Sequence, residues 1–304
     1  MRTCAISFGL ALGLCLMGVG SARAALQPAA QQADKTRPGL PPGEKKAVAA
    51  AIKSAPTPAK ELTLDLGGGV KLELVLIPAG EFLMGSADSD PKAENDEKPR
   101  HRVRITKPFY LGKYKVMQDQ WQTVMGNNPS SYRGPKYPVQ GVSWNDCQTF
   151  MKKLNKKFGP AGGNFQLPTE AQWEYACRAG GGTQWCCGDD VSKLDQYAWY
   201  EGNCGAGIHP LGEKKPNAWG LYDIHGDVWE WCADTYDRGY YAVSPAADPA
   251  GPSWAGQRVL RGGSWYLGPD YARSARRSWL SPDVGSLLHG FRLARTTDSP
   301  GKTR

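Results

Sequence analysis

The sequence predicts an α+β fold with little regular secondary structure, formed by one large domain over residues 64–297. Glycine and proline are frequent, with 37 and 23 of the 304 residues, and this frequency predicts many turns. Short apolar or alternating segments between the turns predict strands, whereas only three segments have the apolar spacing of a helix. The aromatic residues are concentrated in this domain, so its core should depend on them.

The N-terminus has the pattern of a secretory signal peptide over residues 1–24. Arg2 is followed by an apolar run from Ala5 to Val19, and Ala22-Arg23-Ala24 supplies small residues at the expected cleavage position. The apolar run is too short for a membrane span, and no later segment is long enough either. We therefore expect an exported protein, periplasmic or extracellular, without a membrane span.

Residues 25–63 are rich in alanine, proline and lysine and contain no aromatic side chain. Such a segment cannot bury enough apolar surface to offset its conformational entropy, so we expect a flexible tether. We also expect residues 298–304 to form a disordered tail. The formal net charge is +8, and it falls to +6 once Arg2 and Arg23 leave with the signal peptide. This excess is small and diffuse, which argues against nucleic acid as a partner.

Four segments near the start of the domain are predicted strands. Leu72–Pro78 is a continuous apolar run, and Gly80–Gly85 follows it closely enough to be its hairpin partner. The charged segment Ser86–Pro99 is predicted to be a loop. Beyond it, Arg102–Ile105 alternates between polar and apolar residues, and Phe109–Tyr114 continues in extended form.

Three segments are predicted helices. The first, Met117–Met125, places its apolar residues on one face and stops at a glycine-containing turn. The second begins with Ser143 or Asn145 as N-cap, and lysines crowd its last turn, where the helix dipole favours positive charge. The third is a short helix capped by Thr169.

One acidic and aromatic segment, Trp219–Asp234, dominates the second half of the domain. Its aromatic rings favour burial, but buried carboxylates need a pairing group, hydrogen bonds or a cation. The carboxylates are Asp223, Asp227, Glu230 and Asp234. Two compensations are open: a Ca²⁺ ion held by oxygens of Asp223, Gly226, Val228 and Glu230, or pairing with the nearby arginines.

Six motifs in order resemble the formylglycine-generating enzyme family, also called the sulfatase-modifying factor family. They are Ile77–Gly85, Pro138–Trp144, Leu167–Ala176, Trp219–Tyr222, Arg261–Trp265 and Gly290–Leu293. The resemblance implies a complex C-type-lectin-like fold with bound calcium. It also implies that the positions of Asp223, Gly226, Val228 and Glu230 hold one calcium ion, so it favours calcium over arginine pairing.

The resemblance also identifies a departure in the reactive centre. Family enzymes bind Cu(I) through two cysteines five residues apart, and in this chain those positions hold Leu267 and Ala272. Neither side chain can bind copper, which prefers sulfur ligands. Gly268 also replaces the histidine that usually follows the first cysteine. We therefore do not expect copper as a cofactor.

Six of the eight cysteines lie after the signal peptide, namely Cys147, Cys177, Cys186, Cys187, Cys204 and Cys232. In an oxidising compartment their even number predicts disulfides, although sequence cannot choose the pairing. The adjacent Cys186 and Cys187 are poorly suited to bond each other. A soft-metal site formed by Cys186, Cys187 and Cys204 is the less favoured alternative.

The C-terminal third combines tryptophan, tyrosine and arginine, residues suited to stacking and to recognition of carboxylates or sulfates. We predict a binding groove in this part of the domain. Its candidate residues are Arg261, Ser264, Trp265, Arg273 and Arg276. The alternative is that most of the tryptophans fill the core and that some of the arginines neutralise the acidic segment.

Three functions compete. The first is an exported, calcium-stabilised binding module whose groove takes a peptide, a glycan or a partner protein. The second is an oxidoreductase of different chemistry, like periplasmic relatives that mature siderophores, with His225, Glu230 or Asp234 as acid or base. Here His225 is expected to be a buried histidine bonded to a carboxylate. The least favoured is formylglycine generation on sulfatases through another cysteine pair.

Overall fold

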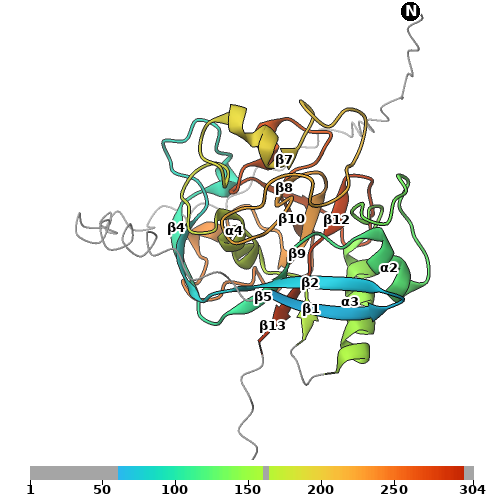
Figure 1. The fold of residues 1–304 in the computed structure, drawn as a ribbon. Coiled ribbons are helices and arrows are strands. Elements are labelled where there is room, and N and C mark those ends of the chain that lie inside the picture. Colours follow the sequence, from blue (N-terminus) through green and yellow to red (C-terminus); the bar gives the residue numbers. More distant parts are fainter. Residues whose placement is uncertain (1–60, 160–163, 298–304) are drawn as a thin grey trace, which may run out of the picture. The chain divides into compact units, whose positions relative to one another are not determined.

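The computed structural model describes residues 61–159 and 164–297 of the chain. The predicted signal peptide, most of the tether and the predicted tail lie outside the described residues. Within them, no helix is both long and apolar enough to cross a membrane. Two main sheets and two small ones are joined by long irregular segments, with few helices (Figure 1). The predicted α+β class with little regular structure is confirmed.

The first sheet has the strand order β1-β2-β5-β13-β6. Its strands are β1 (Glu61–Gly67), β2 (Val70–Ile77), β5 (Phe109–Gly112), β6 (Phe165–Gln166) and β13 (Ala294–Thr296). β1 and β2 form an antiparallel hairpin around Gly67, Gly68 and Gly69, which all have positive φ. The expected tether boundary at residue 63 is corrected, because Glu61 already pairs with Val75.

β3 (Gly80–Met84) does not form the predicted hairpin with the strand before it. It pairs with β4 (His101–Ile105), while β2 pairs with β1 and β5. The two-residue connection Pro78-Ala79 suggested a hairpin, but the edges of β2 are already taken by two longer-range partners. Local spacing therefore gave the strands correctly and their pairing wrongly.

The second sheet has the order β11-β10-β9-β12 and supports the acidic segment. Its strands are β9 (Trp229–Thr235), β10 (Arg258–Arg261), β11 (Arg277–Leu280) and β12 (His289–Phe291). β9 lies inside this sheet, antiparallel to β10 and parallel to β12. Two shorter strands precede β9 in the sequence, β7 (Ala198–Trp199) and β8 (His225–Gly226), and they pair in parallel as a small sheet.

The three predicted helices are present as α2 (Gln118–Met125), α3 (Trp144–Phe158) and α4 (Glu170–Arg178). The Ser143 hydroxyl accepts from the Asp146 amide at 3.1 Å, and the Thr169 hydroxyl caps α4 through Gln172 at 3.1 Å. The remaining short helices are η1 (Asn95–Glu97), η2 (Val191–Gln196), η3 (Tyr240–Ala242) and η4 (Pro269–Ala272).

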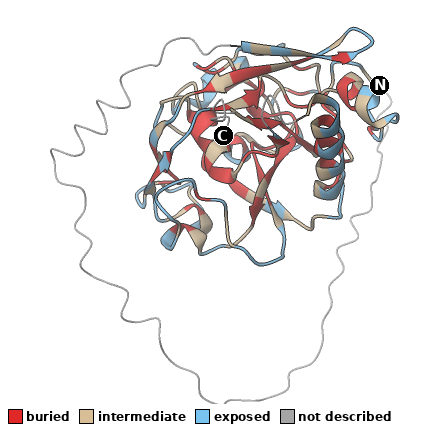
Figure 2. Ribbon diagram, turned by 90° about the horizontal axis from the view of Figure 1, so that it is seen from below, coloured by how far each residue is buried: buried red, intermediate tan, exposed pale blue. Residues whose placement is uncertain are grey.

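The largest core cluster joins both sheets to α2 and α3. Trp121 of α2 stacks on Phe150 of α3 with ring centroids 5.3 Å apart, and Phe291 of β12 packs edge-on against both. Buried residues gather where the helices and sheets meet (Figure 2). This aromatic core fixes the strands that present the charged residues described next.

Candidate functional site

Glu230, on the interior strand β9, is fully buried and surrounded by donors. Its Oε1 lies 3.1 Å from both Lys115 Nζ and Arg292 Nη2. Its Oε2 accepts from Trp173 Nε1 at 2.9 Å and from Arg292 Nε at 3.1 Å. We call Lys115, Trp173, Glu230 and Arg292 the Glu230 cluster. Burial acts to raise the pKa of Glu230, but the charges of Arg292 and Lys115 outweigh it, so the pKa is lowered.

Arg292 connects this cluster to three other segments. Two of its five N–H groups bond Glu230, and the other three donate to backbone carbonyl oxygens at 2.7–2.9 Å. These carbonyls belong to Gly112, Lys113 and Tyr222. All five donors of the guanidinium group are therefore satisfied while the side chain is buried.

Two further buried carboxylates, Asp223 and Asp227, each have one oxygen without a partner among the described residues. Asp223 Oδ2 accepts from the Gly212 amide at 2.7 Å, and Asp227 Oδ1 accepts from the His209 amide at 3.3 Å. Burial raises the pKa of Asp227 to about 8 and also raises that of Asp223. Asp227 is therefore largely protonated at neutral pH.

The residues that the resemblance assigned to calcium do not fit a divalent ion as they are placed. A carboxylate has about four lone-pair sites, and four N–H contacts already use those of Glu230. The backbone carbonyl of Asp223 accepts a hydrogen bond from the Lys115 ammonium. Gly226 serves close packing, because a Cβ there would lie 2.1 Å from the Trp199 carbonyl oxygen. Calcium at Asp223, Gly226, Val228 and Glu230 thus stays a prediction from the resemblance. The contacts of these residues in the structure argue against it.

A second buried network lies on α4. Glu174 is fully buried and accepts from Arg261 Nη2, from Arg178 Nε at 2.9 Å and from the Gly85 amide at 2.8 Å. Arg261 also donates to three backbone carbonyls between residues 274 and 276. The prediction that Arg261 lines a binding groove is therefore corrected, because its guanidinium group is inside the protein and paired there.

The other predicted groove residues occupy different environments. Arg273 is buried and forms two hydrogen bonds with Glu97 at 2.7 and 2.8 Å. Arg276 is partly exposed and pairs with the exposed Glu94 at 2.8 Å. Ser264 is buried, and its hydroxyl has no partner among the described residues.

Trp265 lies between two exposed tyrosines. Its ring makes edge contacts with Tyr132 and Tyr266 at centroid distances of 6.1 and 5.4 Å. Tyr132 is 37% exposed and Tyr266 is 61% exposed, whereas the indole Nε1 of Trp265 is buried and has no partner among the described residues. We call Tyr132, Trp265 and Tyr266 the aromatic patch. Trp265 was one of the predicted groove residues. That part of the predicted groove is therefore a surface rich in aromatic side chains.

The positions of the missing copper ligands are apolar. Ala272 is buried against Trp185 and Leu194, and its carbonyl lies 2.7 Å from His225 Nδ1. Burial lowers the pKa of His225 to about 4, so this histidine is neutral. It bonds a carbonyl and the Cys186 amide, at 3.0 Å, rather than the carboxylate expected. Leu267 packs at the border of the main core.

The six cysteines, all within the described residues, carry free thiols, so the structure does not contain the predicted disulfides. They are distributed over several elements, with Cys147 on α3, Cys177 on α4 and Cys232 on β9. Cys204 lies beside the Trp265 carbonyl, which its Sγ approaches at 3.1 Å. Among the described residues, no three histidine, cysteine, aspartate or glutamate side chains are arranged to hold a metal ion.

We expect the thiols to differ strongly in reactivity. A hydrogen bond from Cys186 lowers the pKa of Cys187, which is partly exposed, whereas burial raises the pKa of Cys147 and Cys232 far above its usual value. Maleimide labelling of the native protein should modify Cys187 first and leave Cys147 and Cys232 protected until unfolding. Peptide mass mapping over time would measure this order, and early labelling of Cys147 would contradict the structure.

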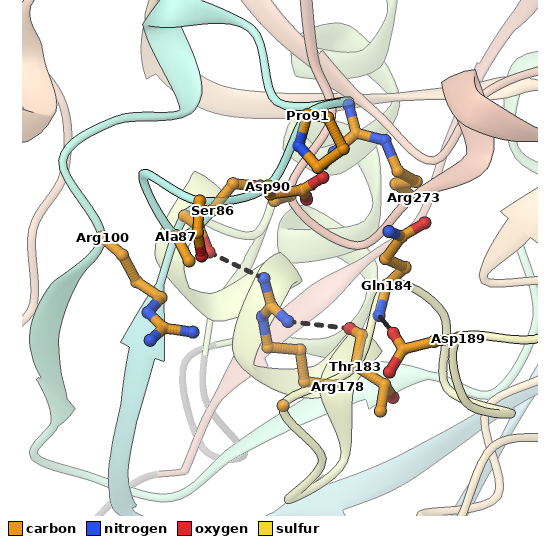
Figure 3. Close-up of a pocket in the computed structure, with 14 residues that line it drawn as sticks. Ser86, Ala87, Asp90, Pro91, Arg100, Arg178, Thr183, Gln184, Asp189 and Arg273 are labelled. Carbon is orange, nitrogen blue, oxygen red and sulfur yellow. Dashed lines mark hydrogen bonds and ion pairs between the residues drawn. The ribbon is translucent and has the colours of Figure 1, made fainter.

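A polar pocket of about 260 Å³ lies beside the loop that follows β3 (Figure 3). Arg100, Arg178 and Arg273 line it together with Asp90 and Gln184. Arg178 and Arg273 are already paired with buried glutamates, as described above. Arg100 is exposed and forms no ion pair with the described part of the chain, so it is the guanidinium group available to an acidic ligand.

Curled sheets, sparse helices and long ordered loops define a C-type-lectin-like scaffold of the sulfatase-modifying type. The chain belongs to the family of the Sulfatase-modifying factor enzyme 1-like domain, which matches residues 70–297. The resemblance drawn from the motifs is thereby confirmed.

Relatives and solved structures agree with this assignment. The formylglycine-generating enzyme of Streptomyces coelicolor is 30% identical over 290 positions, covering 74% of this chain and 89% of that enzyme. Treponema denticola variable protein 1 matches with a TM-score of 0.71 and 32% identity, over 79% of this chain and 100% of that one. PvdO from Pseudomonas aeruginosa matches with a TM-score of 0.69 and 29% identity, over 80% of this chain and 100% of that one.

Proposed function

We propose that this protein is an exported binding module of the sulfatase-modifying factor family, with a peptide, glycan or protein ligand on the aromatic patch. The observation that carries the proposal is Trp265, a partly exposed ring that makes edge contacts with the exposed Tyr132 and Tyr266. Exposed aromatic side chains that lie together offer a stacking surface of the kind found at binding sites.

The residue types at the reactive centre argue against copper-dependent formylglycine generation. Leu267 and Ala272 offer no thiolate, and Cu(I) needs soft sulfur ligands. The Cys177 thiol and the Cys186 backbone amide lie against His225 instead, and His225 also bonds the Ala272 carbonyl. We therefore propose a member of the family that has kept the scaffold and lost this chemistry.

An oxidoreductase of different chemistry is less well supported. His225, Glu230 and Asp234 were its candidate acids and bases, and all three are buried. Glu230 is committed to Lys115 and Arg292, and His225 is neutral with both ring nitrogens bonded. A group that exchanges protons with a substrate must come within hydrogen-bond reach of it. Export, which the sequence led us to expect, belongs to the proposal and rests on the sequence. Calcium stabilisation, which the resemblance implied, is not part of it, because Lys115 and Arg292 already hold the Glu230 carboxylate.

The proposal is tested by binding of the purified domain to arrays of peptides and glycans. We expect Trp265→Ala and Tyr266→Ala to weaken the strongest binding by about tenfold or more, because central aromatic anchors dominate such surfaces. Trp254→Ala is the matched control, since Trp254 is 56% exposed and lies outside the aromatic patch.

Two outcomes would contradict the proposal. Loss of binding in Arg100→Ala, with binding retained in Trp265→Ala, would move the ligand to the polar pocket. Conversion of a cysteine in a sulfatase-derived peptide to an aldehyde, detected by mass, would restore the formylglycine-generating function.

A further inference from the structure

The ε-ammonium group of Lys115 lies where the acidic segment needs a cation. Lys115 follows β5 and precedes α2, and its side chain is completely buried. The ammonium donates to the backbone carbonyl of Asp223 and lies 3.1 Å from Glu230 Oε1. Asp223 and Glu230 are the first and last residues of the calcium motif that the resemblance implied. The ammonium group therefore contacts both ends of that motif.

The two positive side chains of the Glu230 cluster supply the charge of one divalent ion. Ca²⁺ requires six to eight oxygens at roughly 2.3–2.6 Å, whereas an ammonium group is satisfied by about three acceptors at hydrogen-bond distance. Lys115 contributes one charge and Arg292 the second, and both contact the Glu230 carboxylate. A calcium ion at the same oxygens would have to displace a fixed positive charge that cannot leave the chain.

We propose that Lys115 is the resident cation of this site, so that the domain is stable without calcium and becomes responsive to calcium when Lys115 is shortened. The proposal is independent of the ligand bound at the aromatic patch. It follows from the contacts of Lys115 and from the saturated Glu230 carboxylate, which are features of this chain.

A shortened side chain would leave oxygens suited to a hard cation. The Asp223 carbonyl and Glu230 Oε1 would each lose their ammonium partner. Asp223 Oδ1, which is buried and has no partner among the described residues, belongs to the same residue as the freed carbonyl. Oxygen donors with a vacant volume between them are what Ca²⁺ binding requires.

The experiment compares wild type with two variants of one residue. Lys115→Ala removes the charge and opens space, whereas Lys115→Met removes the charge and fills the space. We expect the wild-type Tm to be the same in millimolar calcium and in chelator, with far less than one calcium per chain by elemental analysis. Both variants should lose about 10 °C in chelator, because each leaves a buried ion cluster without one partner.

Calcium should then restore several degrees to Lys115→Ala and little to Lys115→Met. Equal responses of the two variants to calcium would overturn the proposal. So would a wild-type protein that retains one calcium per chain and loses stability when the ion is removed. The wild-type measurement tests stability without calcium even if neither variant folds. Refolding of Lys115→Ala with and without calcium tests whether shortening Lys115 makes the domain respond to calcium.

Discussion

Replacing Arg261 by methionine should lower the free energy of unfolding by about 3–5 kcal/mol, the range expected when a buried ion pair loses one partner. The change leaves Glu174 with one cation, Arg178, in a site without solvent exposure. It also removes the donors to the carbonyls of residues 274–276, which hold the segment between β10 and β11. Urea unfolding at neutral pH, followed by tryptophan fluorescence, measures the loss.

Arg276→Met is the matched control for this prediction. Arg276 was also assigned to the groove, but its short contact is with the exposed Glu94 at 2.8 Å, and exposed ion pairs contribute about 0–1 kcal/mol. It also lies 3.8 Å from the buried Glu97, but Arg273 would still pair with that carboxylate in the variant. The structure therefore predicts a large loss for Arg261→Met and a small one for Arg276→Met. Comparable losses would mean that burial does not separate the two arginines, and the assignment of Arg261 to the core would fail.

The helices were predictable because their signals are local. Ser143 and Thr169 cap α3 and α4 through groups three residues away in sequence, and Gly126 ends α2 with positive φ. A cap and an apolar face are sufficient to place such an element, whatever it packs against. The pairing of β3 with β4 depends instead on the whole first sheet, so spacing alone could not give it.

The depth of charged side chains was not predictable in the same way. Arg261 and Arg276 belong to the same third of the chain and have the same chemistry, yet one is in the core and the other near the surface. Lys115 carried no sequence signal at all, since it lies between a predicted strand and a predicted helix. Its role follows from residues more than 100 positions away, Asp223 and Glu230.

The acidic segment shows why the calcium expectation and the structure differ. Sequence reasoning left open whether a cation or arginines compensate its carboxylates, and resemblance favoured the cation. In the structure Arg292 and Lys115 compensate Glu230, while burial leaves Asp227 largely protonated. The carboxylates of one short segment are thus accommodated in two different ways, by pairing and by protonation.

Asp234, the last carboxylate of that segment, should make the stability of the domain fall as pH rises. Burial raises the pKa of Asp234 from 3.8 to about 8, with the nearby Glu170 adding to the shift. Between these values the folded carboxyl keeps its proton and the unfolded one loses it. The folded state therefore binds more protons, so this contribution to stability is present below pH 4 and is lost as pH rises to about 8.

In the folded protein the Glu170 amide donates a hydrogen bond to Asp234 Oδ2 at 2.8 Å. Asp234→Asn removes the titrating group while retaining an oxygen that can accept this bond. We expect the variant to equal wild type near pH 4 and to exceed it by on the order of 3–5 kcal/mol at pH 8. Urea unfolding from pH 4 to 9 measures this difference.

Asp65→Asn is the control, because Asp65 is exposed and a hydrogen bond from Lys71 lowers its pKa. The difference in stability between Asp65→Asn and wild type should be flat over the same pH range. A flat difference for Asp234→Asn as well would mean that Asp234 ionises in the folded protein, and the buried carboxyl would then need a cation that the described contacts do not supply.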